Sequence, residues 1–272
     1  MILTQKLVDT RPPSIGEIAK HATEKQYPSM YQCFIGQVLY FDEPINAETE
    51  NALCSLSHAW IMKGLRPYEQ GVAFDYILPL SPHLVLVEFT AFTPSVINKD
   101  ALAANLSNFV SQHLKSAEHS ISFSVCREEF GVLPMVNFDK NQHYSEPTAS
   151  KRIYGGIIGG AMRASTGYSF LNSLRWAQNV AHGLCQYGKL THCDPIPKHY
   201  RLMDDIMLRV LQKNPELACH LFYRFANRLS STSYARFMTE KATLLDIVKV
   251  ILAMPKWPFL KSFLSKIYAN YQ

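Results

Sequence analysis

One carboxylate lies inside one of the most apolar segments of the chain, Leu84–Thr90. Because the side chains of a strand alternate between its two faces, Glu88 shares a face with Leu86 and Thr90. An ionised carboxylate among apolar side chains is costly unless it is hydrated or paired. Glu88 therefore either faces water or an arginine, or it is protonated, with a raised pKa, and acts as a general acid. The residues alone leave both interpretations open.

A glycine-rich segment, 155–168, precedes a predicted helix that begins near Ser169. Glycines allow backbone N–H groups to approach a ligand closely, and the start of a helix offers unpaired N–H donors. Together these features suit a phosphate group or the carbonyl edge of a flavin ring. The spacing does not match G-x-G-x-x-G, however, and a tight packing turn between strand and helix would explain the glycines as well.

Two further groups of residues have the chemistry of a site. In Arg127–Met135, charged residues are followed by glycine and proline, which predicts either a loop that enters a buried site or a surface turn. The residues His182, Cys185, His192 and Cys193 are close in sequence but contain no C-x-x-C pair, so we expect no metal site. The six cysteines are scattered along the chain, which is typical of reduced thiols in a cytoplasmic protein.

Strand patterns precede helical patterns along the chain. The sequence predicts strands at 2–8, 31–40, 74–78, 84–90 and 121–126, with a short proline-marked hairpin between the third and the fourth. It predicts helices at 98–114, 169–187, 202–212, 215–229 and 244–253, and an amphipathic helix at the C-terminal end. This order predicts a mixed fold (α+β or α/β), with an antiparallel sheet and a helical C-terminal layer.

The composition excludes several classes of protein. Hydrophobic residues make up 47% of the 272 residues and charged residues 18%, which is enough apolar material for a core and excludes wholesale disorder. The net charge of +5 is concentrated in 241–272, with five Lys and one Asp, so the chain lacks the broad basic face of a nucleic-acid-binding protein. The sequence contains neither a signal-peptide pattern nor an apolar run long enough to span a membrane.

The C-terminal segment combines basic and apolar residues. Its last predicted helix carries an apolar stripe, with Lys261 and Lys266 off the stripe and Trp257 at its start. This pattern is typical of a helix that lies on an anionic membrane surface, but a helix packed on the domain with solvated lysines has the same pattern. The stripe consists of Phe259, Leu260, Phe263, Leu264, Ile267 and Tyr268.

Four motifs, in this order, resemble those of the lycopene cyclase family of flavoproteins. Asp9-Thr-Arg11 is similar to the D-x-R that ends a strand of the family's flavin domain. Phe74–Thr93 resembles its "F-x-Y-x-L-P-x-S…x-V-E-x-T-x-F" hairpin, and Arg127–Met135 resembles its "R-E-x-x-G-x-[IL]-P-M". Gly159–Phe170 resembles its "G-G-x-x-x-x-S-T-G-Y-x-F", where the chain returns to the flavin. Each motif alone is weak evidence for the resemblance, but four motifs in the same order as in the family are specific evidence.

The resemblance implies a fold like that of flavin-dependent hydroxylases and a reaction that closes the ψ-ends of lycopene into ionone rings. This reaction is an isomerisation without net redox change, in which reduced FAD stabilises cationic character. Glu88 takes the position of the family's essential carboxylate, so a general acid there would protonate the terminal alkene. Apolar walls, with Tyr76 and Phe89 among them, would exclude water. The resemblance places the cofactor next to Asp9, Arg11, Gly159, Gly160, Thr166, Gly167 and Tyr168.

The resemblance also implies a division of the chain into four regions and a set of partners. The regions are a remnant of the dinucleotide domain (1–30), a substrate domain with an antiparallel sheet (31–125), a return segment that contacts the flavin (126–188) and a helical region (189–272). The expected partners are a carotenoid or another long isoprenoid and a membrane surface, and no nucleic acid. We expect a cytoplasmic protein that is peripherally associated with a membrane.

Two features depart from the family pattern. The sequence has no G-x-G-x-x-G unit for the ADP part of FAD, so we expect the chain to begin inside the flavin domain and a separate N-terminal chain to complete it. The family's Met-Asp-Phe-like motif is replaced by different residues at 51–60. The alternative function is a non-catalytic or partner-dependent isoprenoid-binding half of a split flavoprotein.

Overall fold

The computed structural model describes residues 6–45, 57–116, 119–140 and 152–269, and the chain divides into two compact units. The first unit comprises Met1–Ser29, Pro134–Asn214 and His220–Gln272. The second comprises Met30–Leu133 and Pro215–Cys219. This division reflects only how compact each part of the chain is. It does not test the four functional regions expected from the sequence, which remain a prediction.

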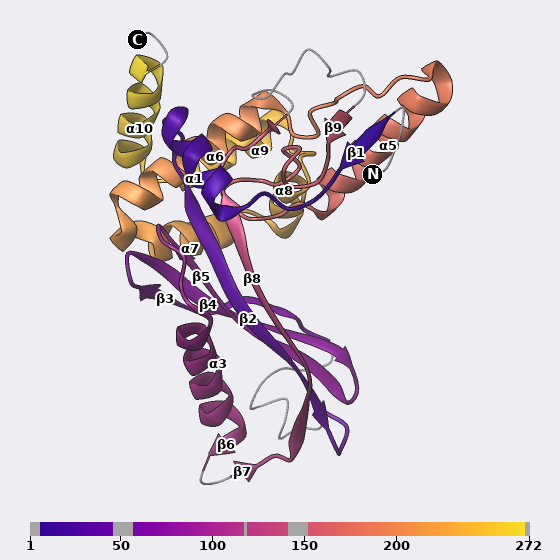
Figure 1. The fold of residues 1–272 in the computed structure, drawn as a ribbon. Helices are drawn as coiled ribbons and strands as arrows, with labels where there is room; N and C mark the ends of the chain where they lie inside the picture. The colour runs from indigo at the N-terminus through magenta and orange to yellow at the C-terminus, as the bar shows by residue number, and fades with distance from the viewer. Residues whose placement is uncertain (1–5, 46–56, 117–118, 141–151, 270–272) are drawn as a thin grey trace. The chain divides into compact units, whose positions relative to one another are not determined.

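A five-stranded sheet forms the body of the second unit. Its strands lie in the order β3-β4-β5-β2-β8, and the pairs β2–β5, β4–β5 and β3–β4 are antiparallel (Figure 1). The predicted hairpin is confirmed, because β4 and β5 contain 74–78 and 84–90 and pair directly. The strands are β2 (Met30–Phe41), β3 (Trp60–Tyr68), β4 (Gly71–Ser81), β5 (Leu84–Thr93) and β8 (Phe123–Met135).

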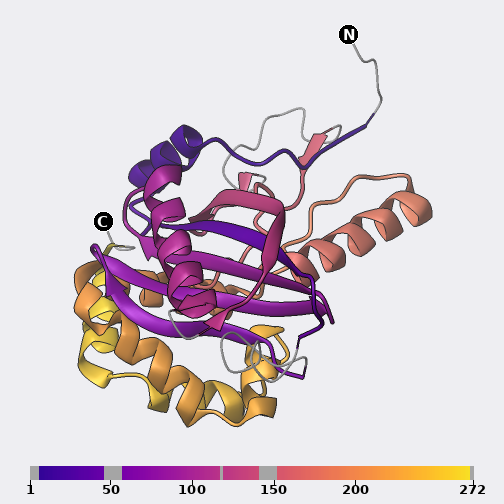
Figure 2. The same ribbon diagram turned by 90° about the horizontal axis from the view of Figure 1, so that it is seen from below.

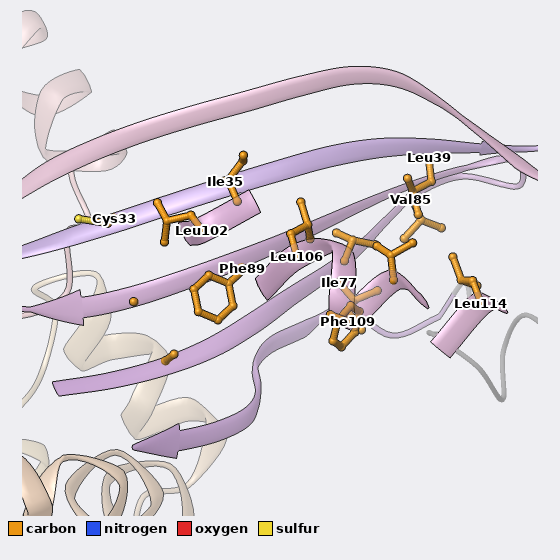
Figure 3. Packing of buried hydrophobic residues seen from close by; sticks show 14 of the residues in the cluster. Cys33, Ile35, Leu39, Ile77, Val85, Phe89, Leu102, Leu106, Phe109 and Leu114 are labelled. Carbon is orange, nitrogen blue, oxygen red and sulfur yellow. The ribbon is translucent and has the colours of Figure 1, made fainter. Parts of the chain in front are cut away.

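One helix, α3 (Lys99–Leu114), packs across a face of this sheet (Figure 2). The predicted helix at 98–114 is confirmed, since its apolar positions, three or four residues apart, all reach the core between helix and sheet. Figure 3 shows side chains from α3, β2, β4 and β5 in this core. The core includes Cys33, Ile35, Leu39, Ile77, Val85, Val87, Phe89, Leu102, Leu106, Phe109 and Leu114.

Strand β8 corrects two predictions. Residues 127–135, predicted as a loop or a turn, continue the strand, and the predicted half-buried strand at 121–126 begins only at Phe123 and is exposed from 124 to 128. The reason is its position at the edge of the sheet, where glycine and proline are tolerated because one side needs no hydrogen-bonded neighbour. At Gly131 a Cβ would lie 2.4 Å from Cζ of Phe34, so the Phe34 ring would have to move to accept any other residue there.

The first unit begins with a short strand and a helix. Strand β1 (Leu7–Asp9) pairs in parallel with β9 (Arg152–Tyr154). The predicted strand at 2–8 therefore overlaps β1, while residues 1–5 lie outside the described residues. Helix α1 (Ile15–Glu24), which the sequence analysis missed, starts with a capping box between Ser14 and Glu17.

Helices make up the rest of the first unit. The predicted helices at 169–187, 202–212 and 244–253 are confirmed, and 215–229 is a 3₁₀ turn followed by α7. Pro258 lies in the first turn of α10 and does not break it, because a proline there removes no helical hydrogen bond. The fold is thus mixed α and β, with an antiparallel sheet and a helical C-terminal region, as predicted. The helices are α5 (Phe170–Tyr187), α6 (Lys198–Lys213), α7 (Ala218–Arg228), α8 (Ser231–Met238), α9 (Leu244–Ala253) and α10 (Lys256–Ala269).

Candidate functional site

Glu88 lies in the middle of β5, on the face opposite the α3 core. Its cross-strand neighbours are Gly36 on β2 and Tyr76 on β4, so the three residues share one face of the sheet. The side chain is half-buried, and Oγ1 of Thr90 donates a hydrogen bond of 2.6 Å to its Oε1. The alternation predicted for this strand is confirmed, because Val85, Val87, Phe89 and Ala91 all lie in the core.

Burial raises the pKa of Glu88 from its ordinary value to about 7. The negative charge of Glu129 raises the pKa further, while the hydrogen bond from Thr90 lowers it. At neutral pH the carboxyl group is therefore present in both protonation states. Such a group can donate a proton to a weak base and take one back, which is the requirement for a general acid and base.

Glu88 and the Arg127–Met135 motif meet at one place on the sheet. A Cβ at Gly36 would lie 3.3 Å from Cβ of Glu88 and 3.3 Å from Cγ of Glu129. Glycine at this position therefore gives both carboxyl side chains room on the same face. Arg127 pairs with Glu129 at 2.6 Å, with the arginine largely exposed. The sequence offered no signal for Gly36, because its role follows only from the pairing of β2 with β5.

The two predicted substrate-contacting residues lie on opposite faces of the sheet. Tyr76 is on the Glu88 face and makes an edge-to-face contact with Phe74, with ring centroids 5.4 Å apart. Phe89 follows Glu88 in β5, so its ring points into the core, where it is fully buried and contacts Tyr68. Of the two, the geometry places only Tyr76 beside Glu88.

The raised pKa of Glu88 predicts a pH dependence of stability. Between about pH 4.5 and 7 the folded state binds more protons at Glu88 than the unfolded state, so rising pH lowers the free energy of unfolding, by up to about 3 kcal/mol. The variant Glu88→Gln should lack this component. We therefore expect the variant to gain stability relative to the unmodified chain across this interval, as measured by urea denaturation at pH 4.5, 6 and 8. An identical pH profile for both proteins would show that the pKa of Glu88 is not raised.

Asp9 joins the first strand to the glycine-rich segment, which lies in the first unit. Its carboxylate accepts hydrogen bonds from Nη2 of Arg11 at 2.7 Å and from Nη2 of Arg152 at 2.5 Å. These arginines hold the pKa of the buried Asp9 carboxyl well below its usual range. The backbone oxygen of Asp9 accepts from the N–H of Gly155 at 2.9 Å. The D-x-R motif thus fixes the entrance of the glycine-rich segment.

Two glycines of this segment are required by the packing of the chain itself. A Cβ at Gly159 would lie 2.3 Å from the backbone oxygen of Tyr154. Gly160 has φ of +82°, and a Cβ there would lie 2.9 Å from Nη2 of Arg201 and 3.0 Å from the oxygen of Phe138. Both observations favour the packing-turn interpretation at these two positions.

Replacing Gly160 with alanine is therefore expected to destabilise the chain by about 1–3 kcal/mol, through the left-handed backbone and the two close contacts. Gly16→Ala is the matched control, because Gly16 lies in α1 and a methyl group added there would meet no atom within 4 Å. The control should leave stability unchanged or raise it by up to about 1 kcal/mol. Equal effects of the two substitutions in thermal unfolding would contradict the packing argument.

A buried ion-pair network anchors the segment that follows. Arg163 is fully buried and donates to Asp204 from Nε at 2.8 Å and from Nη2 at 2.7 Å. Its Nη1 reaches Glu240 at 3.2 Å. Asp204 also accepts from Oγ of Ser165 at 2.7 Å. The sequence analysis missed this network, because its members are far apart in the chain and none of them stands in a recognisable spacing.

The start of α5, and not the preceding turn 166–168, has the donors that suit a cofactor. The N–H groups of Thr166 and Gly167 both donate to the oxygen of Arg163 inside the turn. The first turn of α5 has no acidic side chain, and its N-cap residue Ser169 makes no capping hydrogen bond. The N–H groups of that turn are thus the donors suited to an anionic group or to the carbonyl edge of a flavin.

The last helices expose an apolar surface. On α10, Trp257, Leu260, Phe263 and Leu264 are exposed, while the side chains of Ile267 and Tyr268 lie outside the described residues. Lys266 fits neither interpretation of the lysines, facing anionic lipid or solvated, because it forms an ion pair with Asp205 of α6 and is mostly buried. On α9 the exposed apolar residues are Leu244, Leu245, Val248, Ile251 and Leu252.

Two further observations concern metals and membranes. In the described ranges no three His, Cys, Asp or Glu side chains are grouped as metal ligands would be. His192 instead lies 3.2 Å from Asp139, and Cys193 contacts the backbone of Trp176. Among the helices that the structure describes, none has the length and hydropathy needed to cross a bilayer.

The likeness to known proteins extends over most of the chain. A family model described as lycopene cyclase protein matches residues 2–264, and no curated protein sequence matches the chain. A geranylgeranyl bacteriochlorophyll reductase-like protein from Thermoplasma acidophilum is 10% identical, with a TM-score of 0.40 over 88% of this chain and 55% of that chain. A p-nitrophenol 4-monooxygenase from Pseudomonas putida is 10% identical, with a TM-score of 0.35 over 88% of this chain and 54% of that chain. An anhydrotetracycline hydroxylase from Streptomyces rimosus is 12% identical, with a TM-score of 0.28 over 89% of this chain and 42% of that chain. This chain therefore spans about half of the length of these three structures or less.

Proposed function

Because the chain belongs to the lycopene cyclase family, we propose that it takes part in closing the linear ends of lycopene into ionone rings. The reaction is an acid-initiated isomerisation, so it needs one group that gives a proton and one that accepts a proton. The observation that supports this role is Glu88, a half-buried carboxyl with a pKa raised to about 7 on an otherwise apolar strand.

In the proposed reaction, the protonated carboxyl of Glu88 transfers its proton to the terminal alkene of the substrate. The resulting cation is attacked by the neighbouring double bond, and the ring closes. A proton is then lost from the ring and returns to the Glu88 carboxylate, so atoms and charge balance. Thr90 holds the carboxylate oxygen in place, and Tyr76 lies beside Glu88 as part of the wall that excludes water.

The cofactor of the proposed reaction is reduced FAD, which when bound would supply negative charge next to the cationic intermediate. The first turn of α5 would hold its ring, because the N–H groups at the start of a helix suit the carbonyl edge, and the turn 166–168 would lie beside it. Asp9 and Arg11 would support this region from β1. We propose that a separate flavin-domain chain holds the ADP part.

A direct assay tests this function. The purified chain, mixed with a nucleotide-binding half and reduced FAD, is incubated with lycopene, and the carotenoids are separated by chromatography. Cyclised product that depends on both halves supports the proposal. A binding-only role would give saturable binding of lycopene without any cyclised product.

The carotenoid substrate dissolves in membranes, so we propose that α9 and α10 bind an anionic membrane surface. Their exposed apolar residues would enter the interface, and the exposed Lys249, Lys256 and Lys261 could each contribute about 1 kcal/mol near anionic lipid. We expect co-sedimentation with phosphatidylglycerol vesicles at low salt, and loss of binding at high salt or with phosphatidylcholine.

A pair of variants tests which surface is responsible for membrane binding. Trp257→Glu should weaken vesicle binding by about tenfold, because it places a charge at the start of the apolar stripe. Val125→Glu changes an exposed apolar residue of β8 and should have no effect. Equal binding by both variants would exclude α10 as the membrane contact.

A further inference from the structure

The helices of the first unit form a cavity of about 550 Å³ that shares only Thr166 with the residues proposed to contact the flavin. All the residues that line it belong to the first unit, and none lies in the sheet that carries Glu88. Its volume is in the usual range of ligand cavities, roughly 300–1,000 Å³. The apolar lining comes from five helices, α6 to α10, and includes Met203, Met207, Phe225, Phe237, Val250 and Phe259.

Apart from Lys256 at the rim, the polar side chains of the lining already have partners in the protein. Asp204 accepts hydrogen bonds from Arg163 and from Ser165, and Oγ1 of Thr166 accepts from the N–H of Tyr168. A ligand in this cavity therefore finds no polar group that needs it as a partner. Such a lining favours a hydrocarbon over a polar metabolite, because a polar ligand would lose its hydration without replacement.

The cavity opens to the surface between α9 and α10. Ile251, Leu260 and Phe263 line the cavity and are also 58%, 49% and 38% exposed, so they mark its mouth. The surface around the mouth is apolar as well, with Leu252, Trp257 and Leu264 exposed. A ligand that enters here comes from an apolar phase, and it meets the exposed Lys256 at the rim.

We propose that this cavity binds a single long hydrocarbon chain, of an acyl or isoprenoid compound, which enters between α9 and α10. The methionines of the lining are suited to such a flexible ligand, because their unbranched side chains adapt to different shapes. The cavity shares no residue with the proposed proton transfer at Glu88, so the chain can hold this ligand whether or not it is a cyclase.

Fluorescence titration with cis-parinaric acid, an 18-carbon polyene, tests the proposal on the full chain without vesicles, flavin or lycopene. We expect saturable binding of one molecule per chain and displacement by oleic acid. Met207→Trp should weaken binding by about tenfold or more, because it fills the cavity and removes the burial of several methylene groups. Leu184→Trp, on the exposed side of α5, is the matched control and should bind as the unmodified chain does.

A second variant keeps the proposal testable if Met207→Trp does not fold. Leu260→Glu places a charge at the mouth on a residue that is half exposed, so it should fold normally and still weaken binding. Circular dichroism establishes that each variant is folded. The proposal is overturned if the unmodified chain does not bind the probe, or if folded Met207→Trp and Leu260→Glu bind it as tightly as the control.

Discussion

Replacing Glu88 with glutamine is expected to lower the rate of ring closure by about 10²–10⁴-fold in the complemented enzyme, with flavin binding unchanged. Glutamine keeps the size of the side chain and still accepts the hydrogen bond from Thr90, which lies 2.6 Å away. It cannot donate an acidic proton to an alkene. The measurement is the initial rate of cyclised product, together with flavin absorbance after gel filtration.

The control for this experiment is Glu128→Gln, which removes a carboxylate from β8, a strand separated from β5 by β2. Glu128 is exposed and pairs with Lys99 at 2.8 Å. Its substitution should leave ring closure close to the original rate. If Glu88→Gln retains near-normal turnover, Glu88 is not the acid of the reaction, whatever rate the Glu128→Gln control shows.

The pH dependence of ring closure provides a check that does not need a variant. A general acid with a pKa of about 7 is active in its protonated form, so the rate should fall as the pH rises through 7. The stability of the folded chain should fall between about pH 4.5 and 7, because in this interval Glu88 keeps its proton in the folded state and has lost it in the unfolded state. If the stability stops falling near the pH at which the rate begins to fall, both profiles are assigned to Glu88.

Local pattern was sufficient to predict the elements that are amphipathic or regularly spaced. The alternation in 84–90 and the three- and four-residue spacing in 98–114 each identify the buried face correctly. The same alternation also shows why Phe89 does not lie beside Glu88, since adjacent residues of a strand face opposite sides. The alternation can be read from the sequence alone, and it excludes Phe89 from the apolar wall that we expected beside Glu88.

Features that depend on distant partners could not be predicted in this way. The motif 127–135 looks like a loop because it contains charge, glycine and proline, but at a sheet edge these residues are tolerated in a strand. Gly36 gives Glu88 and Glu129 room only because β2 lies between β5 and β8 in the sheet. Helix α8, with a serine N-cap and only eight residues, is too short for a periodic signal.

The buried network around Arg163 should have the largest effect on stability. Arg163→Leu leaves the Asp204 carboxylate buried without its arginine partner and leaves Glu240 with Arg175 as its remaining arginine, and both carboxylates are at most 2% exposed. Breaking a buried pair by removing one partner costs about 3–5 kcal/mol. The guanidinium also lies over the rings of Tyr200 and Phe237, at 4.7 and 5.2 Å from their centroids, so its loss removes packing as well.

Urea denaturation of three variants separates this network from a general effect of removing an arginine. Arg11→Leu is the control, because its arginine is largely exposed and Asp9 keeps Arg152 as a partner, so stability should change little. The double variant Arg163→Leu with Asp204→Leu should be less destabilised than the sum of the single changes, since it removes both charges together. Additive losses would show that the arginine stabilises the turn through packing and not through its ion pair. A loss no greater for Arg163→Leu than for Arg11→Leu would show that the network does not hold the segment between β9 and α5 in place.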